Sequence, residues 1–318
     1  MKGTKYVISS THIDSQGYKM AMSALESMLP QLNGVRKPRL GLEHIRTFPP
    51  LGVIMNGNIT QGEDSHFYLT AEMVYFDKQE LIMQEDGSQL LREYFSEGFY
   101  PFIECEEDEN DTLTVATDPA NYDSHEVIEK IHAAASEESS LEFRSELIGR
   151  KSILPDPETI ITITKSIAVT LGIIKSKIPE KVGEAIGEDL AKFYKLISKL
   201  VVETIKNANP SNRPQNFIIS YPNDICNIEL VITTHNVDKV LNALTKEKLK
   251  IISDKLDQLQ NLHPEKIQFL YNTGDLWEFN YLLSKDGSVI GTIKSFNKRN
   301  KLYNKILEQQ NQQSKSEE

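Results

Sequence analysis

Two side chains that together could perform acyl transfer lie 52 residues apart, each inside an apolar stretch of the sequence. His44 ends the segment Pro38–His44, and Ser96 lies within Phe95–Phe99. A histidine in contact with a serine can accept its proton and activate the hydroxyl as a nucleophile. The ordinary pKa of histidine lies close to neutrality and suits this proton transfer. The two residues therefore define a candidate hydrolytic site.

Neither residue is diagnostic by itself. The chain contains seven histidines, and a lone histidine at the end of a strand more often makes an ordinary structural hydrogen bond. Most serines have no chemical role either. Only the fold can decide whether His44 and Ser96 meet.

The composition indicates a globular protein with an acidic surface. Of the 318 residues, 39% are hydrophobic and 25% are charged, and the formal net charge is −11. Excess negative charge opposes contact with phosphates, so we expect no general nucleic-acid binding. The two cysteines, Cys105 and Cys226, lie far apart and do not suggest a disulfide framework. Together with the lack of an apolar signal segment at the start, this favours a cytoplasmic location.

The first 135 residues mix strand and helix patterns. Strands are predicted at 6–10, 51–58, 66–75, 96–103 and 113–116, and helices at 18–29, 81–94 and 124–135. The Ala, Glu and Ser content of 134–140 is typical of a linker. We expect one domain over 1–135, followed by a linker over 136–154.

Six carboxylates lie between Glu104 and Asp111. Several carboxylate oxygens could hold calcium or magnesium. The run lacks the turn glycine and the regular spacing of a calcium loop, so a solvated hairpin tip is the simpler interpretation. We expect no metal site and no cofactor.

The second half divides into three predicted segments, which complete an α+β chain. Residues 155–210 are predicted as an apolar and amphipathic helical segment, 211–308 as an α+β domain, and 309–318 as a disordered tail. The stretch 159–175 is shorter than the roughly 20 apolar residues that span a membrane, which favours burial over membrane contact. In the α+β domain, alternation from Trp277 to Leu283, then Asp286-Gly287, then 289–296 predicts a β-hairpin.

Five short motifs follow one another along residues 5–135. They are an Asp-x-x-Gly turn in Ile13–Gly17, the histidine segment Pro38–His44 with Pro50–Gly52, the strand Phe67–Tyr75, the serine box Phe95–Phe99, and the closing segment Leu113–Asn121. Their order and spacing resemble the prohead, or capsid-maturation, serine proteases of tailed phages, distant relatives of the herpesvirus assemblins. Residues 150–312 show no such resemblance.

The resemblance implies an N-terminal assemblin-like β-barrel with flanking helices. It also implies a serine endopeptidase that works without a cofactor in a bacterial or phage-infected cell, on protein substrates that include the chain itself. Ser96 would attack the peptide carbonyl and His44 would take its proton. Backbone N–H groups near Gly98 would stabilise the oxyanion.

The third catalytic residue departs from the family pattern. The position that is usually acidic falls on Thr112, with Asp111 beside it. Neighbouring residues of a strand face opposite sides, so Asp111 would serve only if a bulge turned it inward. Asp123 and His125 are the alternatives.

The sequence is therefore compatible with two functions from different classes. The first is a serine endopeptidase with Ser96, His44 and Asp111. The second is a non-enzymatic effector or interaction protein, in which the protease-like domain is a binding scaffold and the C-terminal half contacts a partner. Under either one we expect a protein substrate or partner and no nucleic acid. Membrane contact is less favoured, and self-association stays open.

Overall fold

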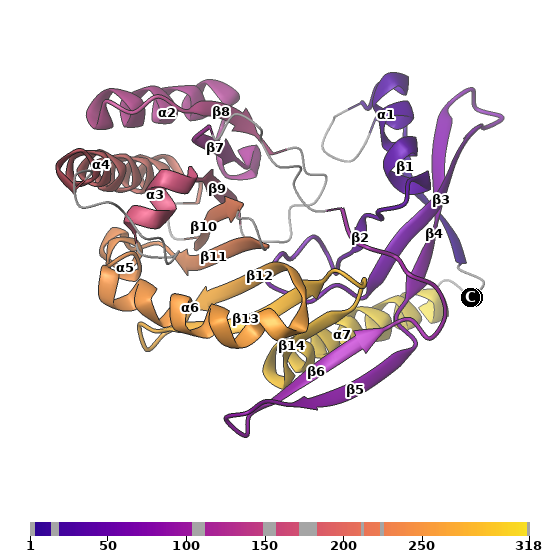
Figure 1. Cartoon of the computed structure of the whole chain (residues 1–318). Coiled ribbons are helices and arrows are strands. Elements are labelled where there is room, and N and C mark those ends of the chain that lie inside the picture. Colours follow the sequence, from indigo (N-terminus) through magenta and orange to yellow (C-terminus); the bar gives the residue numbers. More distant parts are fainter. Residues whose placement is uncertain are drawn as a thin grey trace. The chain divides into compact units, whose positions relative to one another are not determined.

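The chain forms a mixed α/β structure of two compact units (Figure 1), so the coarse α+β prediction is confirmed. The computed structural model describes residues 4–13, 19–103, 112–148, 157–171, 183–210, 213–222 and 226–316. Unit 1 contains Met1–Glu104 and Tyr281–Glu318, and unit 2 contains Cys105–Asn280.

The first sheet of unit 1 is antiparallel and has the strand order β1-β4-β3-β2. Its strands are β1 (Thr4–Ser10), β2 (Arg39–Leu40), β3 (Gly52–Gln61) and β4 (Phe67–Tyr75). Helix α1 (Met22–Asn33) packs on this sheet, with Leu25 and Leu32 buried against Leu69 and Ala71. The strands predicted at 6–10, 51–58 and 66–75 and the neighbouring helix are confirmed, although the helix begins four residues later than expected.

The second group of strands in unit 1 lies where a helix was predicted. Residues predicted as a helix over 81–94 form a hairpin of β5 (Lys78–Met83) and β6 (Gln89–Tyr94). Gly87 has a φ of 81°, so Asp86-Gly87 turns the chain back instead of interrupting a helix. The apolar residues 81–83 and 90–91 fit a helical face and a strand pair equally well. Pairing with a neighbouring strand decides between the helix and the hairpin.

The end of the chain completes this group. Strand β13 (Trp277–Ser284) passes from unit 2 into unit 1 and pairs there with β14 (Val289–Thr292), which in turn pairs with β6. The predicted hairpin is confirmed, but its second strand stops at Thr292. Helix α7 (Ile293–Ser316) follows and covers most of the tail that was predicted to be disordered.

A buried ion pair joins three elements of unit 1. The guanidinium of Arg299 on α7 donates to both carboxylate oxygens of Glu93 on β6, at 2.8 Å each. It also donates to the carbonyl oxygen of Pro50, just before β3, at 2.7 Å. The Arg299 side chain is 3% exposed and that of Glu93 is 12% exposed. Phe296 lies beside the guanidinium, 4.9 Å from its central carbon to the ring centroid.

Replacement of Arg299 by methionine is expected to loosen unit 1. The change leaves the Glu93 carboxylate buried without its cation, at a cost of about 3–5 kcal/mol. Hydrogen exchange of the β6 and α7 amides should then become about 150- to 5,000-fold faster. The double variant Arg299→Met/Glu93→Leu should recover most of the protection, since neither charge remains. Equal exchange in the single and double variants would contradict this role.

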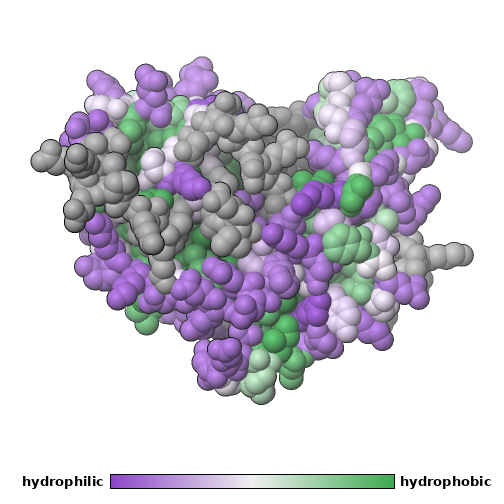
Figure 2. Space-filling view, in the orientation of Figure 1, coloured by the Kyte–Doolittle hydropathy of each residue, from purple (hydrophilic) through white to green (hydrophobic). Residues whose placement is uncertain are grey.

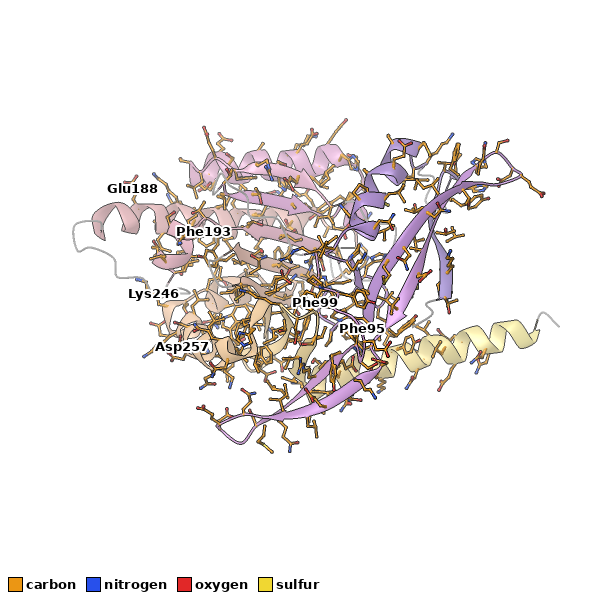
Figure 3. The ribbon with its side chains drawn as sticks, turned by 45° about the vertical axis from the view of Figure 1, so that its right-hand side comes forward. Phe95, Phe99, Glu188, Phe193, Lys246 and Asp257 are labelled. Carbon is orange, nitrogen blue, oxygen red and sulfur yellow. The ribbon has the colours of Figure 1, made fainter. Side chains whose placement is uncertain are left out.

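Unit 2 contains a mixed sheet with the strand order β12-β11-β10-β9-β7-β8. The strands are β7 (Thr114–Thr117), β8 (Arg144–Leu147), β9 (Glu158–Thr162), β10 (Gln215–Pro222), β11 (Asn227–Thr234) and β12 (Pro264–Tyr271). The helices are η1 (Pro119–Asn121), α2 (His125–Ser139), α3 (Lys165–Thr170), α4 (Gly183–Asn207), α5 (Val237–Ala243), α6 (Lys246–Leu259) and η3 (Gln260–Leu262). Figure 3 shows Phe193 of α4 directed into this unit, whereas Glu188 of the same helix and Lys246 and Asp257 of α6 lie at its margin.

A buried polar network links three strands of unit 2. Glu229 of β11 forms an ion pair with Lys266 of β12, and its carboxylate also accepts a hydrogen bond from Gln268 at 3.0 Å. Gln268 in turn accepts one from Asn280 of β13 at 2.7 Å. All four side chains are almost fully buried. Because each polar group has a partner, this network fixes the register of the strands.

The two units do not coincide with the domains expected from sequence. Helix α2 runs to Ser139 and β8 spans Arg144–Leu147, both inside the expected linker. Strand β9 occupies 158–162, where a helical segment was expected. Strand β7 pairs with β9, so the closing segment of the expected first domain belongs to unit 2. Pairing between strands distant in sequence is not visible in local patterns.

No helix in the described part of the chain is long and apolar enough to cross a membrane.

Candidate functional site

His44 lies in an exposed turn rather than at the end of a strand. Its φ of 57° is in the left-handed region, as is that of Glu43. The turn is held by Tyr281, whose hydroxyl donates to the carbonyl oxygen of Arg46 at 3.0 Å. Gly52 of the following Pro-Leu-Gly segment is required sterically, because a Cβ there would lie 1.9 Å from the Val74 carbonyl oxygen.

Ser96 is held by a carboxylate. It follows β6 in a bend, so the strand predicted over 96–103 is not formed. Its hydroxyl donates to Asp77 Oδ2 at 2.5 Å and its backbone N–H to Asp77 Oδ1 at 2.7 Å. The hydrogen bond from the Ser96 hydroxyl lowers the pKa of the Asp77 carboxyl below its ordinary value. Asp77 thus closes the open end of the β5–β6 hairpin and leaves Ser96 no imidazole as a base.

The predicted catalytic residues lie on different segments of unit 1, His44 in a turn and Ser96 in the bend after β6. Among the described residues, no hydrogen bond joins His44 to Ser96. Figure 3 labels Phe95 and Phe99, which flank the serine: Phe95 is buried, whereas Phe99 is 60% exposed. Gly98 has a φ of 90°, and a Cβ there would lie 2.7 Å from the Tyr100 ring.

The three candidates for the third catalytic residue give no support to the pair of His44 and Ser96. Asp111 lies outside the described residues, as does the whole acidic run from Glu104. The Asp123 carboxylate accepts a hydrogen bond from Asn209 at 3.0 Å. His125 is exposed in the first turn of α2.

A different serine–histidine contact occurs in unit 2, and sequence analysis did not single it out. His132 of α2 is 4% exposed and lies between two hydroxyls. Its Nδ1 contacts the hydroxyl of Ser145 on β8, and its Nε2 contacts that of Thr117 on β7 at 2.8 Å. A neutral imidazole has one donor and one acceptor, so both ring nitrogens are satisfied.

The electrostatics of this contact oppose catalysis. A general base must carry a positive charge after it accepts a proton, and a carboxylate usually stabilises that charge. His132 faces Thr117 instead, and burial lowers its pKa to about 4. Such a histidine is a weak base at neutral pH. Its geometry fits a structural role, in which it joins α2 to β7 and β8.

The stability of unit 2 is therefore expected to depend on pH through His132. The folded pKa of about 4 lies below the ordinary value of 6.5, so between these pH values the unfolded chain binds a proton that the folded chain does not. The stability that neutral His132 contributes to the folded state is complete above pH 6.5 and is lost as the pH falls toward 4. The free energy of unfolding should drop by about 3 kcal/mol over this range.

This can be measured by urea unfolding followed through Trp277, the single tryptophan, which is buried in unit 2. His132→Gln keeps one donor and one acceptor but does not titrate, so it serves as the control and should lose less stability on acidification. An equal loss in both proteins would exclude His132 as the cause.

A third polar cluster lies at the end of the β3–β4 hairpin. His12 Nε2 lies 2.8 Å from Asp64 Oδ2 and 2.7 Å from the Tyr68 hydroxyl, and the rings of His12 and His66 are stacked with centroids 3.8 Å apart. The His12 and Asp64 side chains are each about two-fifths exposed. The cluster connects β1 to the hairpin tip. Within the part of the chain that the structure describes, no group of three His, Cys, Asp or Glu residues is placed to hold a metal ion.

The outer edge of β5 is the most distinctive surface of unit 1. β5 is the first strand in its sheet, and its outer side pairs with no other described strand. Leu81 is 60% exposed and Met83 is 64% exposed, on the same face of the strand. Figure 2 shows apolar surface at the lower margin of the molecule, where Figure 1 places β5 and β6.

The other face of β5 is held in place by charge. Arg92 of β6 donates to Glu80 of β5 at 2.8 Å and to Asp286 of the β13–β14 turn at 2.5 Å. Its Nε also donates to the Ser288 hydroxyl at 3.2 Å. The open edge is therefore a supported strand, with its backbone oriented for pairing.

Other open edges are less suited to pairing. β1 exposes Tyr6 and Val7, but its ladder is interrupted by a register shift between Val7 and Ser9. β8 has only four residues and carries an Arg144–Glu146 ion pair. Bulges and short charged strands are the usual protection of sheet edges, and β5 lacks both over its apolar half.

Comparison with known proteins yields no match: no family model, no curated protein and no solved structure is similar to this chain. Function must therefore be inferred from the residues themselves.

Proposed function

We propose that this protein is a non-catalytic interaction protein that binds an extended polypeptide by adding it as a strand to β5. One observation carries the proposal: a regular, supported edge strand that exposes Leu81 and Met83. Main-chain hydrogen bonds from such an edge provide affinity, and alternate side chains provide specificity. Edges of this kind associate unless they are protected.

The arrangement of the predicted protease residues agrees with a binding role for unit 1. The Ser96 hydroxyl donates to Asp77, and among the described residues no hydrogen bond joins Ser96 to His44. The serine endopeptidase function and the assemblin-like barrel stay predictions, and no distance in unit 1 favours them over a binding scaffold.

A fluorophosphonate probe tests the absence of an activated serine. Such probes label a serine whose hydroxyl is activated by a base. We expect no labelling of Ser96 and no difference between the native chain and Ser96→Ala, measured by mass spectrometry of the intact protein. Labelling at Ser96 that disappears in His44→Ala would overturn the non-catalytic proposal in favour of the endopeptidase.

Selection from a library of random displayed decapeptides tests the binding edge. The expected binders alternate apolar and polar residues and lose affinity for Leu81→Lys/Met83→Lys, because two lysines replace the apolar face and repel a docking strand. Val35→Lys is the matched control, since Val35 is 80% exposed on the loop after α1. Peptides that bind the double variant as tightly as the native chain would show that β5 is not the site.

A further inference from the structure

We propose that the strand which pairs with β5 is β5 of a second copy of this chain, joined to it antiparallel about a two-fold axis at Ile82. This inference rests on the proposed function, because it names the partner of the same edge. It makes the protein a dimer in which the two β5 strands join the hairpins of two copies into one continuous sheet.

The backbone of β5 determines which residues can take part. Gln84 N–H donates to the Ser88 carbonyl oxygen at 2.9 Å, and β5 pairs with β6 from Lys78↔Tyr94 to Met83↔Gln89. Hydrogen-bonding residues alternate along an antiparallel pair, so the backbone N–H and C=O groups of the even-numbered residues of β5 point toward β6. The N–H and C=O groups of Gln79, Leu81 and Met83 face outward and are available to a new strand.

One register satisfies both the backbone and the side chains. With Ile82 opposite the Ile82 of the second copy, Leu81 faces the second copy's Met83 and Met83 faces its Leu81. These are hydrogen-bonded pairs made by the outward backbone groups, and they cover the two most exposed apolar residues of the strand with each other.

Neighbouring registers that keep the same backbone parity are poorer. A shift of the axis to Glu80 places two glutamates opposite each other. A shift to Leu81 pairs Met83 with Gln79 and leaves Ile82 facing Glu80. A shift to Met83 sets Leu81 against Glu85. Only the axis at Ile82 places Leu81, Ile82 and Met83 all opposite apolar side chains of the second copy.

Cysteine cross-linking tests the register directly. Residues at the axis form a non-hydrogen-bonded pair with Cα atoms about 4.5 Å apart, within the range that a disulfide spans. In a background with Cys105→Ser and Cys226→Ser, Ile82→Cys should form a covalent dimer under mild oxidation, seen on a non-reducing gel. Glu80→Cys is the matched control: it lies on the same face, but four residues separate it from its counterpart in this register. Cross-linking of Glu80→Cys as readily as Ile82→Cys would overturn the register.

The oligomeric state tests the dimer itself. Light scattering after gel filtration should give twice the chain mass of 36.1 kDa for the native protein. Leu81→Lys/Met83→Lys should raise the dimer dissociation constant about 10- to 100-fold, because two apolar cross-strand pairs become like-charged. Val35→Lys should leave the constant unchanged. A native protein with the mass of one chain throughout a dilution series would overturn the inference.

The two proposals fail separately. If the native chain is monomeric but selected peptides require Leu81 and Met83, the edge binds a foreign strand and only the dimer is wrong. If neither self-association nor peptide binding depends on these residues, both proposals fall.

Discussion

Unit 1 depends on one buried ion pair. Arg299 is supplied by the last helix of the chain, and it holds Glu93 of β6 and the backbone at Pro50 together. A buried guanidinium needs several acceptors, and the Glu93 carboxylate and the Pro50 carbonyl oxygen provide them. The C-terminal helix therefore sets the position of β6, and through the β5–β6 ladder it sets that of the exposed edge. The binding surface is organised by residues about two hundred positions away in the chain.

The hairpin of β5 and β6 also determines the partner of Ser96. Ser96 lies at the mouth of a hairpin, where its hydroxyl and backbone N–H are both used by Asp77. A charge-assisted hydrogen bond of this kind is stronger than a neutral one, so a histidine would have to displace a carboxylate to reach the serine. His132 and Ser145 illustrate the converse: the contact exists, but burial makes the histidine a poor base.

An apolar strand face in contact with water is unfavourable unless something covers it. The charged face of β5 is fixed by Arg92, whereas the face with Leu81 and Met83 has no such partner among the described residues. Pairing with a second copy removes this surface from water and satisfies the outward backbone groups in the same step. In the proposed dimer, the exposed edge of each chain thus stabilises the association of the two.

Local patterns by themselves determined much of the secondary structure. The alternation of Phe67–Tyr75, the helical spacing after Leu190 and the Asp286-Gly287 turn each specify an element, since a period of 2 or 3.6 residues and a positive φ are local properties. The tertiary structure alone decided the rest. Residues 81–94 are apolar in a pattern that suits a helix or a hairpin, and α2 continues beyond the predicted helix into residues 136–139, where composition suggests a linker. Ser96 meets Asp77 because β5 pairs with β6, whereas the pairing of β7 with β9 and of β6 with β14 joins segments distant in the chain and leaves no trace in local sequence.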